Sequence, residues 1–179
     1  MTDSPAPATT TIVVMGVSGS GKTSVAAELT RQLGWEYIEG DELHPAENVA
    51  KMAAGTPLDD DDRWPWLRRI AAVVGEHEAA GTSLVLTCSA LKRTYRDLLR
   101  EGHPSVWFAH VDVDPDVLAE RLAKRQNHYM PPSLLDSQLA TLQRLGTDEP
   151  GAVIPGDGPL ERTVAELLAD LRAERPAAR

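Results

Sequence analysis

Thr11–Met15 (TIVVM), followed at once by Gly16–Thr23 (GVSGSGKT), is the stretch of sequence that decides the fold class. A short apolar run that is rich in β-branched residues and stopped by glycine is typical of a buried strand in a parallel sheet. The residues after it, up to Leu33, repeat apolar side chains at helical spacing, and Gly34 is placed to end the helix. The sequence therefore predicts a strand, a glycine-rich turn and a helix in direct succession.

The glycine-rich turn matches the pattern G-x-x-x-x-G-K-[ST], with the residues Gly16, Val17, Ser18, Gly19, Ser20, Gly21, Lys22 and Thr23. Its glycines allow successive backbone N–H groups to turn inward as a nest for anions, and the helix points its positive end at the same place. Lys22 is placed to reach the β- and γ-phosphates of ATP, and the Thr23 hydroxyl to bind Mg²⁺. A flexible Gly/Ser turn, the alternative, leaves the preceding strand, the lysine and the threonine unexplained. We therefore expect a nucleoside triphosphate to bind here.

Composition restricts the possible partners. The 179-residue chain has 18 Lys and Arg against 27 Asp and Glu, so we expect no general binding to nucleic acid. No apolar run approaches the roughly 18 residues of a membrane span. The lone Cys88 cannot form an internal disulfide, and residues 1–10 lack the character of a secretory signal. We expect a cytoplasmic protein with one domain over residues 11–174 after a disordered lead-in over residues 1–10.

Strand-like and helix-like segments alternate along the whole chain. The expected strands cover residues 11–15, 35–38, 83–88, 105–111 and 152–154, and the expected helices cover 21–33, 45–54, 60–80, 91–100, 114–126, 133–144 and 160–172. This alternation predicts an α/β domain of three layers around a five-stranded parallel sheet.

A nucleotide-binding turn alone does not specify a reaction, because kinases, GTPases, motors and transport ATPases all use one. The chain is short for a motor and has no N-K-x-D sequence for reading guanine. Its third expected strand, residues 83–88, does not end in the Asp of a Walker B ATPase. Of these classes of nucleotide-binding protein, a kinase for a small molecule fits the sequence best.

Carboxylates at the end of the second expected strand suit the acceptor side of such a kinase. In a parallel sheet this end faces the same crevice as the phosphate-binding turn. Glu39 and Asp41 are two residues apart, so along an extended chain they share one direction. We expect Glu39 to hold Mg²⁺ through water, and Asp41 to orient the acceptor hydroxyl or take its proton. A solvated acidic turn is the alternative.

Several further stretches resemble the gluconokinase family in order and spacing. They are residues 40–45 (GDELHP), 57–67 (PLDDDDRWPWL), 88–100 (CSALKRTYRDLLR), 128–132 (HYMPP) and the pair Ser137-Gln138. The resemblance covers residues 11 to about 170. It implies the three-layer fold of the P-loop kinases, related to shikimate and nucleoside-monophosphate kinases, and a homodimer. It also implies a helical acceptor-binding insert over about residues 41–80 and a lid over about 121–135. The implied reaction is phosphorylation of the 6-hydroxyl of D-gluconate with ATP and Mg²⁺.

The carboxylate of gluconate needs cations on this acidic chain. Lys92 and Arg96 are four residues apart and share one face of the expected helix. We expect this pair to bind the carboxylate, with Arg63 of the insert as a further candidate; a solvated basic helix face is the alternative. His44 is either a substrate contact or a loop cap. The acids at residues 59–62 are expected to cap a helix rather than to act in catalysis.

A kinase also needs cations that close over the transferring phosphate. Arg121, Arg125 and His128 lie close together before a polar break. The resemblance implies that Arg121 packs on adenine, that Arg125 reaches the phosphates and stabilises the transferring group, and that His128 contacts substrate at the tip of the lid. Charged surface residues are the alternative.

Two other functions stay open at this point. One is a kinase for another small sugar acid such as shikimate, because stereospecificity depends on a few hydrogen bonds. The other is a regulator that binds ATP without transferring phosphate.

Overall fold

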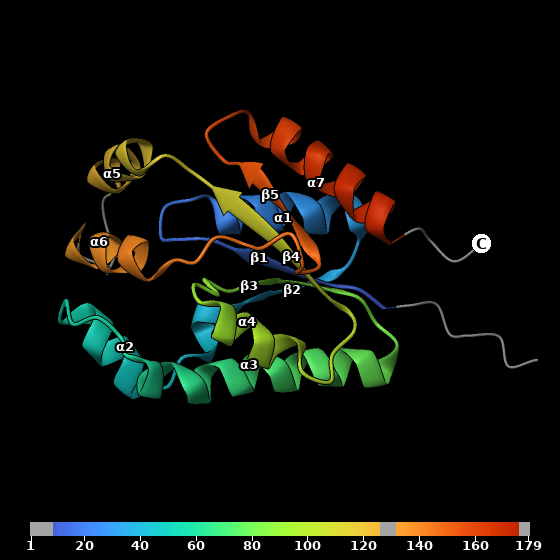
Figure 1. Ribbon diagram of the computed structural model, residues 1–179, viewed down its shortest axis with the longest axis horizontal. Coiled ribbons are helices and arrows are strands. Elements are labelled where there is room, and N and C mark those ends of the chain that lie inside the picture. The colour runs from blue at the N-terminus through green and yellow to red at the C-terminus, as the bar shows by residue number, and fades with distance from the viewer. Residues whose placement is uncertain (1–8, 126–131, 176–179) are drawn as a thin grey trace, which may run out of the picture.

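All the strands of the structure belong to one parallel sheet. The computed structural model describes residues 9–125 and 132–175. Its strands run in the order β2-β3-β1-β4-β5 (Figure 1). Their bounds are β1 Thr11–Met15, β2 Glu36–Glu39, β3 Leu84–Thr87, β4 Val106–Asp112 and β5 Gly151–Pro155. The predicted five-stranded parallel sheet is confirmed.

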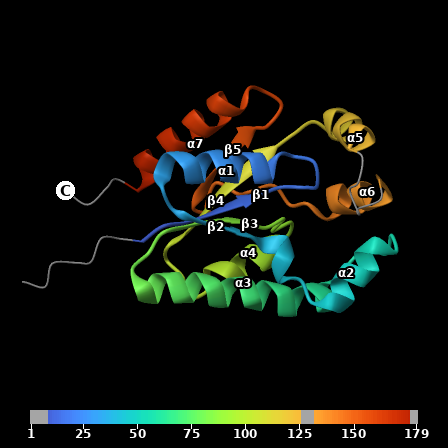
Figure 2. The ribbon, with the colours of Figure 1, turned by 180° about the vertical axis from the view of Figure 1, so that it is seen from behind.

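Helices cover both faces of this sheet. They are α1 Lys22–Leu33, α2 Ala46–Ala53, α3 Asp60–Ala80, α4 Arg93–Arg100, α5 Pro115–Lys124, α6 Pro132–Thr141 and α7 Leu160–Glu174, with a short 3-10 helix η1 at Gly40–Leu43. Helices α1 and α7 lie on one face and α3 and α4 on the other, which confirms the three layers (Figures 1 and 2). Helices α2, α5 and α6 gather at the end where the strands finish. In the described part of the chain, none of the helices has the length and apolar character that crossing a membrane requires.

Strand β1 is the centre of the core. Val13 lies opposite Leu86 of β3 on one side and opposite Phe108 of β4 on the other, and all three are fully buried. A sheet that is covered on both faces explains why these strands read as continuous apolar runs rather than as alternating ones. Each such side chain contributes roughly 1.5–3 kcal/mol on burial.

The capping signals in the sequence work as expected. Gly34 ends α1 in the left-handed conformation, with φ 69°. The Asp59 side chain accepts a hydrogen bond from the Asp62 backbone N–H, and the Asp62 side chain accepts one from the Asp59 N–H. Asp114 caps α5, with Pro115 in the first turn. The interpretation of the acids at 59–62 as helix caps is therefore confirmed for Asp59 and Asp62.

Some boundaries differ from the predicted ones, for identifiable reasons. Helix α4 begins at Arg93 rather than Leu91, since the Leu91 carbonyl accepts a hydrogen bond from the Gln143 N–H at 2.7 Å. The same bond draws Gln143 out of α6, which ends at Thr141. Thr10 already bonds to the third strand, because the Leu84 N–H donates to its carbonyl at 3.0 Å. Of the predicted lead-in, residues 1–8 lie outside the described residues.

Gly40 brings the end of β2 unusually close to β3. A Cβ atom there would lie 1.9 Å from the Thr87 carbonyl oxygen, so no other residue fits without moving the backbone. The Gly40 N–H donates to Thr87 Oγ1 at 3.1 Å, and the Gly40 carbonyl accepts from Trp66 Nε1 at 2.8 Å. This close approach sets the direction in which the chain leaves β2.

Replacing Gly40 by alanine tests this role. We expect Gly40→Ala to lower the free energy of unfolding by about 1–3 kcal/mol, the usual cost of overpacking. Gly158→Ala is the matched control, because nothing lies within 4 Å of its added Cβ. It is expected to change the free energy by less than about 0.5 kcal/mol. Urea unfolding of both variants measures the free energies. Equal losses of stability in the two variants would contradict the claim that the close approach of Gly40 to Thr87 requires glycine.

Candidate active site

A cleft opens at the edge of the sheet where the strands finish, and we call it the main cleft. The structure brings together in it most of the residues that the sequence predicts as functional. These are Ser18, Gly19, Gly21, Lys22, Thr23, Glu39, Asp41, His44, Arg63 and Arg125. A second cleft adjoins it on the other side of the phosphate-binding turn and is lined by Ser20, Arg121 and Gly156, among others. The two clefts share Gly19, Gly21, Ser24 and Arg125.

The phosphate-binding turn connects β1 to α1 in a shape that requires its glycines. Gly19 and Gly21 have φ values of 81° and 95°, which other residues rarely adopt. At Gly16 a Cβ would lie 2.8 Å from the Val111 carbonyl oxygen. Lys22 Nζ donates to the Val17 carbonyl at 3.0 Å, and burial lowers the pKa of Lys22 although Asp41 and Glu39 oppose this. The turn therefore presents an ammonium group and a helix N-terminus to one place.

Glu39, the last residue of β2, is held beside this turn by hydroxyl groups. Thr23 Oγ1 donates to Glu39 Oε2 at 3.1 Å, and the hydroxyls of Tyr37 and Thr87 also donate to the carboxylate. Burial and the neighbouring Glu39 raise the pKa of Tyr37 to about 12, so its hydroxyl remains a donor. Carboxylate and hydroxyl oxygens are the donors that Mg²⁺ prefers.

The described residues contain no group of three or more His, Cys, Asp or Glu side chains that would hold a metal ion. Mg²⁺ typically binds through one or two protein oxygens and completes its shell with water and phosphate oxygens. Thr23 and Glu39 fit that kind of site, in which the nucleotide supplies further ligands.

Asp41, His44 and Arg63 form the other end of the main cleft. Asp41 stands on η1 with its side chain 45% exposed, and His44 Nε2 lies 3.8 Å from its Oδ1. The His44 ring stacks on Trp66, with centroids 4.0 Å apart. Arg63 is buried, and its Nη1 donates to the Tyr95 hydroxyl at 2.9 Å. A carboxylate, an imidazole and a guanidinium group thus face one space.

Some residues of the main cleft were not predicted from the sequence. Trp66 both packs in the core and lines the cleft. By contrast, the sequence does offer the Ser89 hydroxyl as a donor to the acceptor, and Ser89, which follows β3, does line the cleft. Gln138 of α6 accepts a hydrogen bond from the Ser18 N–H at 2.7 Å. The pair Ser137-Gln138 contributed to the family resemblance, which was the available signal for this contact.

Comparison with known proteins agrees with this geometry. The profile of a family described as "AAA domain" matches residues 12–145. A gluconokinase of Gluconobacter oxydans is 49% identical over 163 residues, which are 91% of this chain and 92% of the relative.

The chain belongs to the gluconokinase family.

Solved structures support the same assignment. A gluconokinase from Sinorhizobium meliloti is 46% identical with a TM-score of 0.80, and the match covers 94% of each chain. An unliganded sugar kinase from Janibacter is 51% identical with a TM-score of 0.88, covering 91% of this chain and 94% of that one.

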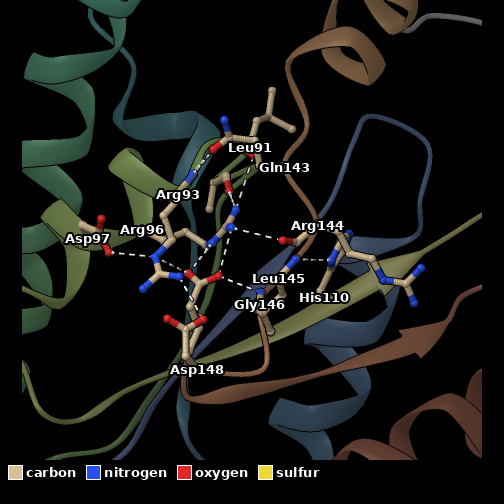
Figure 3. Close-up of polar contacts among 12 residues, drawn as sticks. Leu91, Arg93, Arg96, Asp97, His110, Gln143, Arg144, Leu145, Gly146 and Asp148 are labelled. Carbon is tan, nitrogen blue, oxygen red and sulfur yellow. Dashed lines mark hydrogen bonds and ion pairs between the residues drawn. The ribbon is translucent and has the colours of Figure 1, made fainter.

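In this member of the gluconokinase family, Arg96 does not lie in the main cleft, and its expected contact with substrate is corrected. The Arg96 side chain is fully buried, and its Nε and Nη2 donate to Glu149 at 2.7 and 3.0 Å. Its Nη1 donates to the Ala90 and Leu91 carbonyls (Figure 3). Ala90 has φ 44°, so Arg96 supports a strained turn directly after Ser89.

Lys92 is also placed differently from the prediction. It precedes α4 in an extended conformation, with φ −99° and ψ 149°, so the four-residue spacing to Arg96 does not bring the two onto one helix face. Its Nζ donates to Asp60 Oδ1 at 2.9 Å. It lines a shallow groove with Arg63 and Thr141 rather than the main cleft. The predicted Lys92–Arg96 clamp is therefore wrong.

The predicted lid residues are only partly described. Arg121 of α5 donates to the Gly19 carbonyl at 3.2 Å and to the Gly156 carbonyl at 2.7 Å, which places it in the second cleft. The spacing of four residues between Arg121 and Arg125 predicts a shared helix face, but Arg125 follows Lys124, the last residue of α5, and lies beyond the helix. His128 and the expected lid tip lie outside the described residues.

The structural role of Arg96 leads to a prediction about stability. Removing one partner of a buried ion pair costs roughly 3–5 kcal/mol, so we expect a loss of that size in Arg96→Met. The double variant Arg96→Met/Glu149→Leu should regain part of it, because neither charge is then left buried alone. Arg162→Met is the control: Arg162 pairs with Glu166 on the surface of α7, with side chains 78% and 42% exposed, and exposed pairs contribute about 0–1 kcal/mol. Urea unfolding measures all of these values.

Additive losses in the double variant would contradict the coupling of Arg96 to Glu149. If the Arg96→Met protein is as stable as the wild-type protein but binds the acceptor more weakly, Arg96 contacts the substrate, as the sequence predicted.

Proposed function

We propose that the protein transfers the γ-phosphoryl group of ATP to the 6-hydroxyl of D-gluconate, forming 6-phospho-D-gluconate and ADP. The main support is one arrangement: a phosphate-binding turn with Lys22 and Arg125 faces Asp41, His44 and Arg63 across a single cleft. Membership of the gluconokinase family supports the identity of the acceptor.

In this proposal the residues divide the reaction between them. The N–H groups of residues 16–23 and the Lys22 ammonium bind the phosphates of ATP, with Arg121 at the nucleotide side. Asp41 accepts a hydrogen bond from the acceptor hydroxyl, whose oxygen attacks the γ-phosphorus as the bond to the bridging oxygen breaks. The hydroxyl proton passes to Asp41 and ADP leaves. Arg125 stabilises the charge on the transferring group.

Mg²⁺, held by Thr23 and through water by Glu39, would supply further positive charge to the phosphates when bound. The homodimer, the cytoplasmic location, and the extents of the insert and the lid remain predictions from the sequence.

Arg63 is the cation that we assign to the carboxylate of gluconate. Among the described residues, Lys22, Arg63 and Arg125 are the Lys and Arg side chains that line the main cleft. Lys22 and Arg125 serve the phosphates, whereas Arg63 lies at the end of the cleft near Asp41 and His44. A buried guanidinium held by Tyr95 is already oriented for a carboxylate.

The first test is ADP release with Mg·ATP across a panel of D-gluconate, shikimate, other aldonates, glycerate and nucleoside monophosphates. We expect turnover with D-gluconate, and mass spectrometry should identify a monophosphorylated product. If only another sugar acid is turned over, that sugar acid is the substrate and the assignment of gluconate is wrong. Binding of ATP without turnover on any acceptor would favour a regulator and overturn the proposal.

The assignment of the carboxylate has its own test. Arg63→Met is expected to raise the KM for gluconate about tenfold or more, as the loss of a charged hydrogen bond predicts, with the KM for ATP little changed. Lys92→Met is the matched control, since Lys92 lies outside the main cleft. Thermal unfolding of both variants verifies that they are folded. A larger rise in KM for Lys92→Met than for Arg63→Met would reverse the assignment.

A further inference from the structure

The imidazole of His44 faces the carboxylate of Asp41, and the position of its proton decides what it presents. His44 Nε2 lies 3.8 Å from Asp41 Oδ1, and the His44 side chain is 4% exposed. Its ring is held flat against Trp66, with an interplanar angle of 16°. A neutral imidazole donates from one nitrogen and accepts at the other. His44 therefore turns either an N–H group or a lone pair toward Asp41.

Asn48 determines which of the two it is. Asn48 Nδ2 donates to the Asp62 carbonyl at 2.9 Å. Because a carbonyl oxygen only accepts, this atom of the side chain must be the amide nitrogen, and the orientation of the amide follows. The same Nδ2 lies 3.2 Å from His44 Nδ1. The second hydrogen of the amide is then directed to Nδ1, which must accept it.

A ring that accepts at Nδ1 carries its proton at Nε2, provided that it is neutral. Burial, with a smaller contribution from the Arg63 charge, lowers the pKa of His44 to about 4. At neutral pH the ring is therefore uncharged, and Asn48 leaves one tautomer for it.

We propose that Asn48 is a positioning residue that holds His44 in its Nε2–H tautomer, so that His44 presents a hydrogen-bond donor to the Asp41 carboxylate. The inference rests on the proposed function, in which Asp41 orients the acceptor hydroxyl. The opposite tautomer would set a nitrogen lone pair against a carboxylate and push Asp41 away from its position.

The distance of 3.8 Å is longer than a hydrogen bond. Catalytic contacts are commonly long without substrate and tighten in the complex. Asp41 stands on the short helix η1 with a half-exposed side chain, so a rotation of this side chain would close the gap, while His44 is fixed by Trp66 and Asn48. The ring is thus the rigid partner, and the carboxylate is the one that adjusts.

A different reading of Asn48 is that it only joins α2 to the start of α3 through the Asp62 carbonyl. The chain offers a matched control for that reading. Lys51, also on α2, donates to Asp62 Oδ2 at 2.7 Å and so joins the same two helices. Lys51→Met removes one contact between α2 and α3 and leaves the contact between Asn48 and His44 in place.

The test combines NMR spectroscopy with kinetics on the full chain. Proton–nitrogen correlation spectra of the imidazole rings at neutral pH report directly which nitrogen is protonated, and a His44→Gln variant assigns the signals. In the wild-type protein we expect a proton on Nε2 and none on Nδ1 of His44. Asn48→Leu should give a mixture of tautomers and lower kcat with gluconate about tenfold, as the loss of one hydrogen bond predicts. Lys51→Met should change neither.

A variant with the opposite polarity sharpens the test. In Asn48→Asp the carboxylate accepts rather than donates, so we expect the His44 proton to move to Nδ1 and kcat to fall further than in Asn48→Leu. The signals of His77 and His103, whose Nδ1 atoms contact Thr82 and Glu78, should stay unchanged in every variant that is folded.

A proton on Nδ1 of His44 in the wild-type protein overturns the proposal even if every variant misfolds. If the Asn48→Leu protein keeps both the Nε2–H tautomer of His44 and the kcat of the wild-type protein, Asn48 does not position His44 and the proposal is wrong. The NMR experiment needs no substrate. If the tautomers respond as expected while gluconate is not phosphorylated, the proposed function fails and the tautomer assignment remains.

Discussion

The pairing of β1 between β3 and β4 is the constraint on which the rest of the structure depends. Because all the strands are parallel, the chain leaves each of them at the same edge of the sheet. The turns that follow β1 and β3 are bonded to each other, since the Gly16 N–H donates to the Ser89 carbonyl at 3.3 Å. The residue after β2 is bonded to β3 as well, since the Gly40 N–H donates to the Thr87 side-chain oxygen Oγ1. The phosphate end and the acceptor end of the cleft are therefore parts of one hydrogen-bonded edge.

Positive side chains are concentrated in the main cleft, although the chain as a whole is acidic. The protein has a formal net charge of -9, yet Lys22, Arg63 and Arg125 all line one cleft. Neutral hydroxyl donors hold the carboxylate of Glu39 in place of a Lys or Arg side chain. The three cations are thereby available for anionic ligands, and a local positive site exists on an acidic protein.

The buried ion pair of Arg96 and Glu149 shows why a basic segment need not bind substrate. A guanidinium group in a dry interior must have its N–H groups satisfied, and here a carboxylate and backbone carbonyls do so. The pair joins α4 to the segment that precedes β5, and it supports the turn around Ala90 beside the cleft. Its contribution to the site is the shape of that turn.

The features that could be predicted from the sequence are those that depend on residues close together along the chain. The phosphate-binding turn, the cap at Asp59 and the order of strands and helices follow from contacts between near neighbours, so patterns over a few residues identify them. The position of Asp41 after the second strand identified it as an acceptor-side residue, and the family resemblance supported His44 and Arg63. The structure gathers all three in one cleft.

Only the tertiary structure decided the direction of Lys92 and Arg96 and the roles of Asn48 and Trp66. A four-residue spacing says that two side chains share a helix face, but not where the helix starts or which face is buried. Those depend on partners such as Asp60 and Glu149, which lie 32 and 53 residues away along the chain. Burial and ion pairing are set by such distant contacts. The tautomer of His44 depends on Asn48, four residues away, but the amide of Asn48 is oriented by the Asp62 carbonyl on another helix, so the local spacing does not specify it.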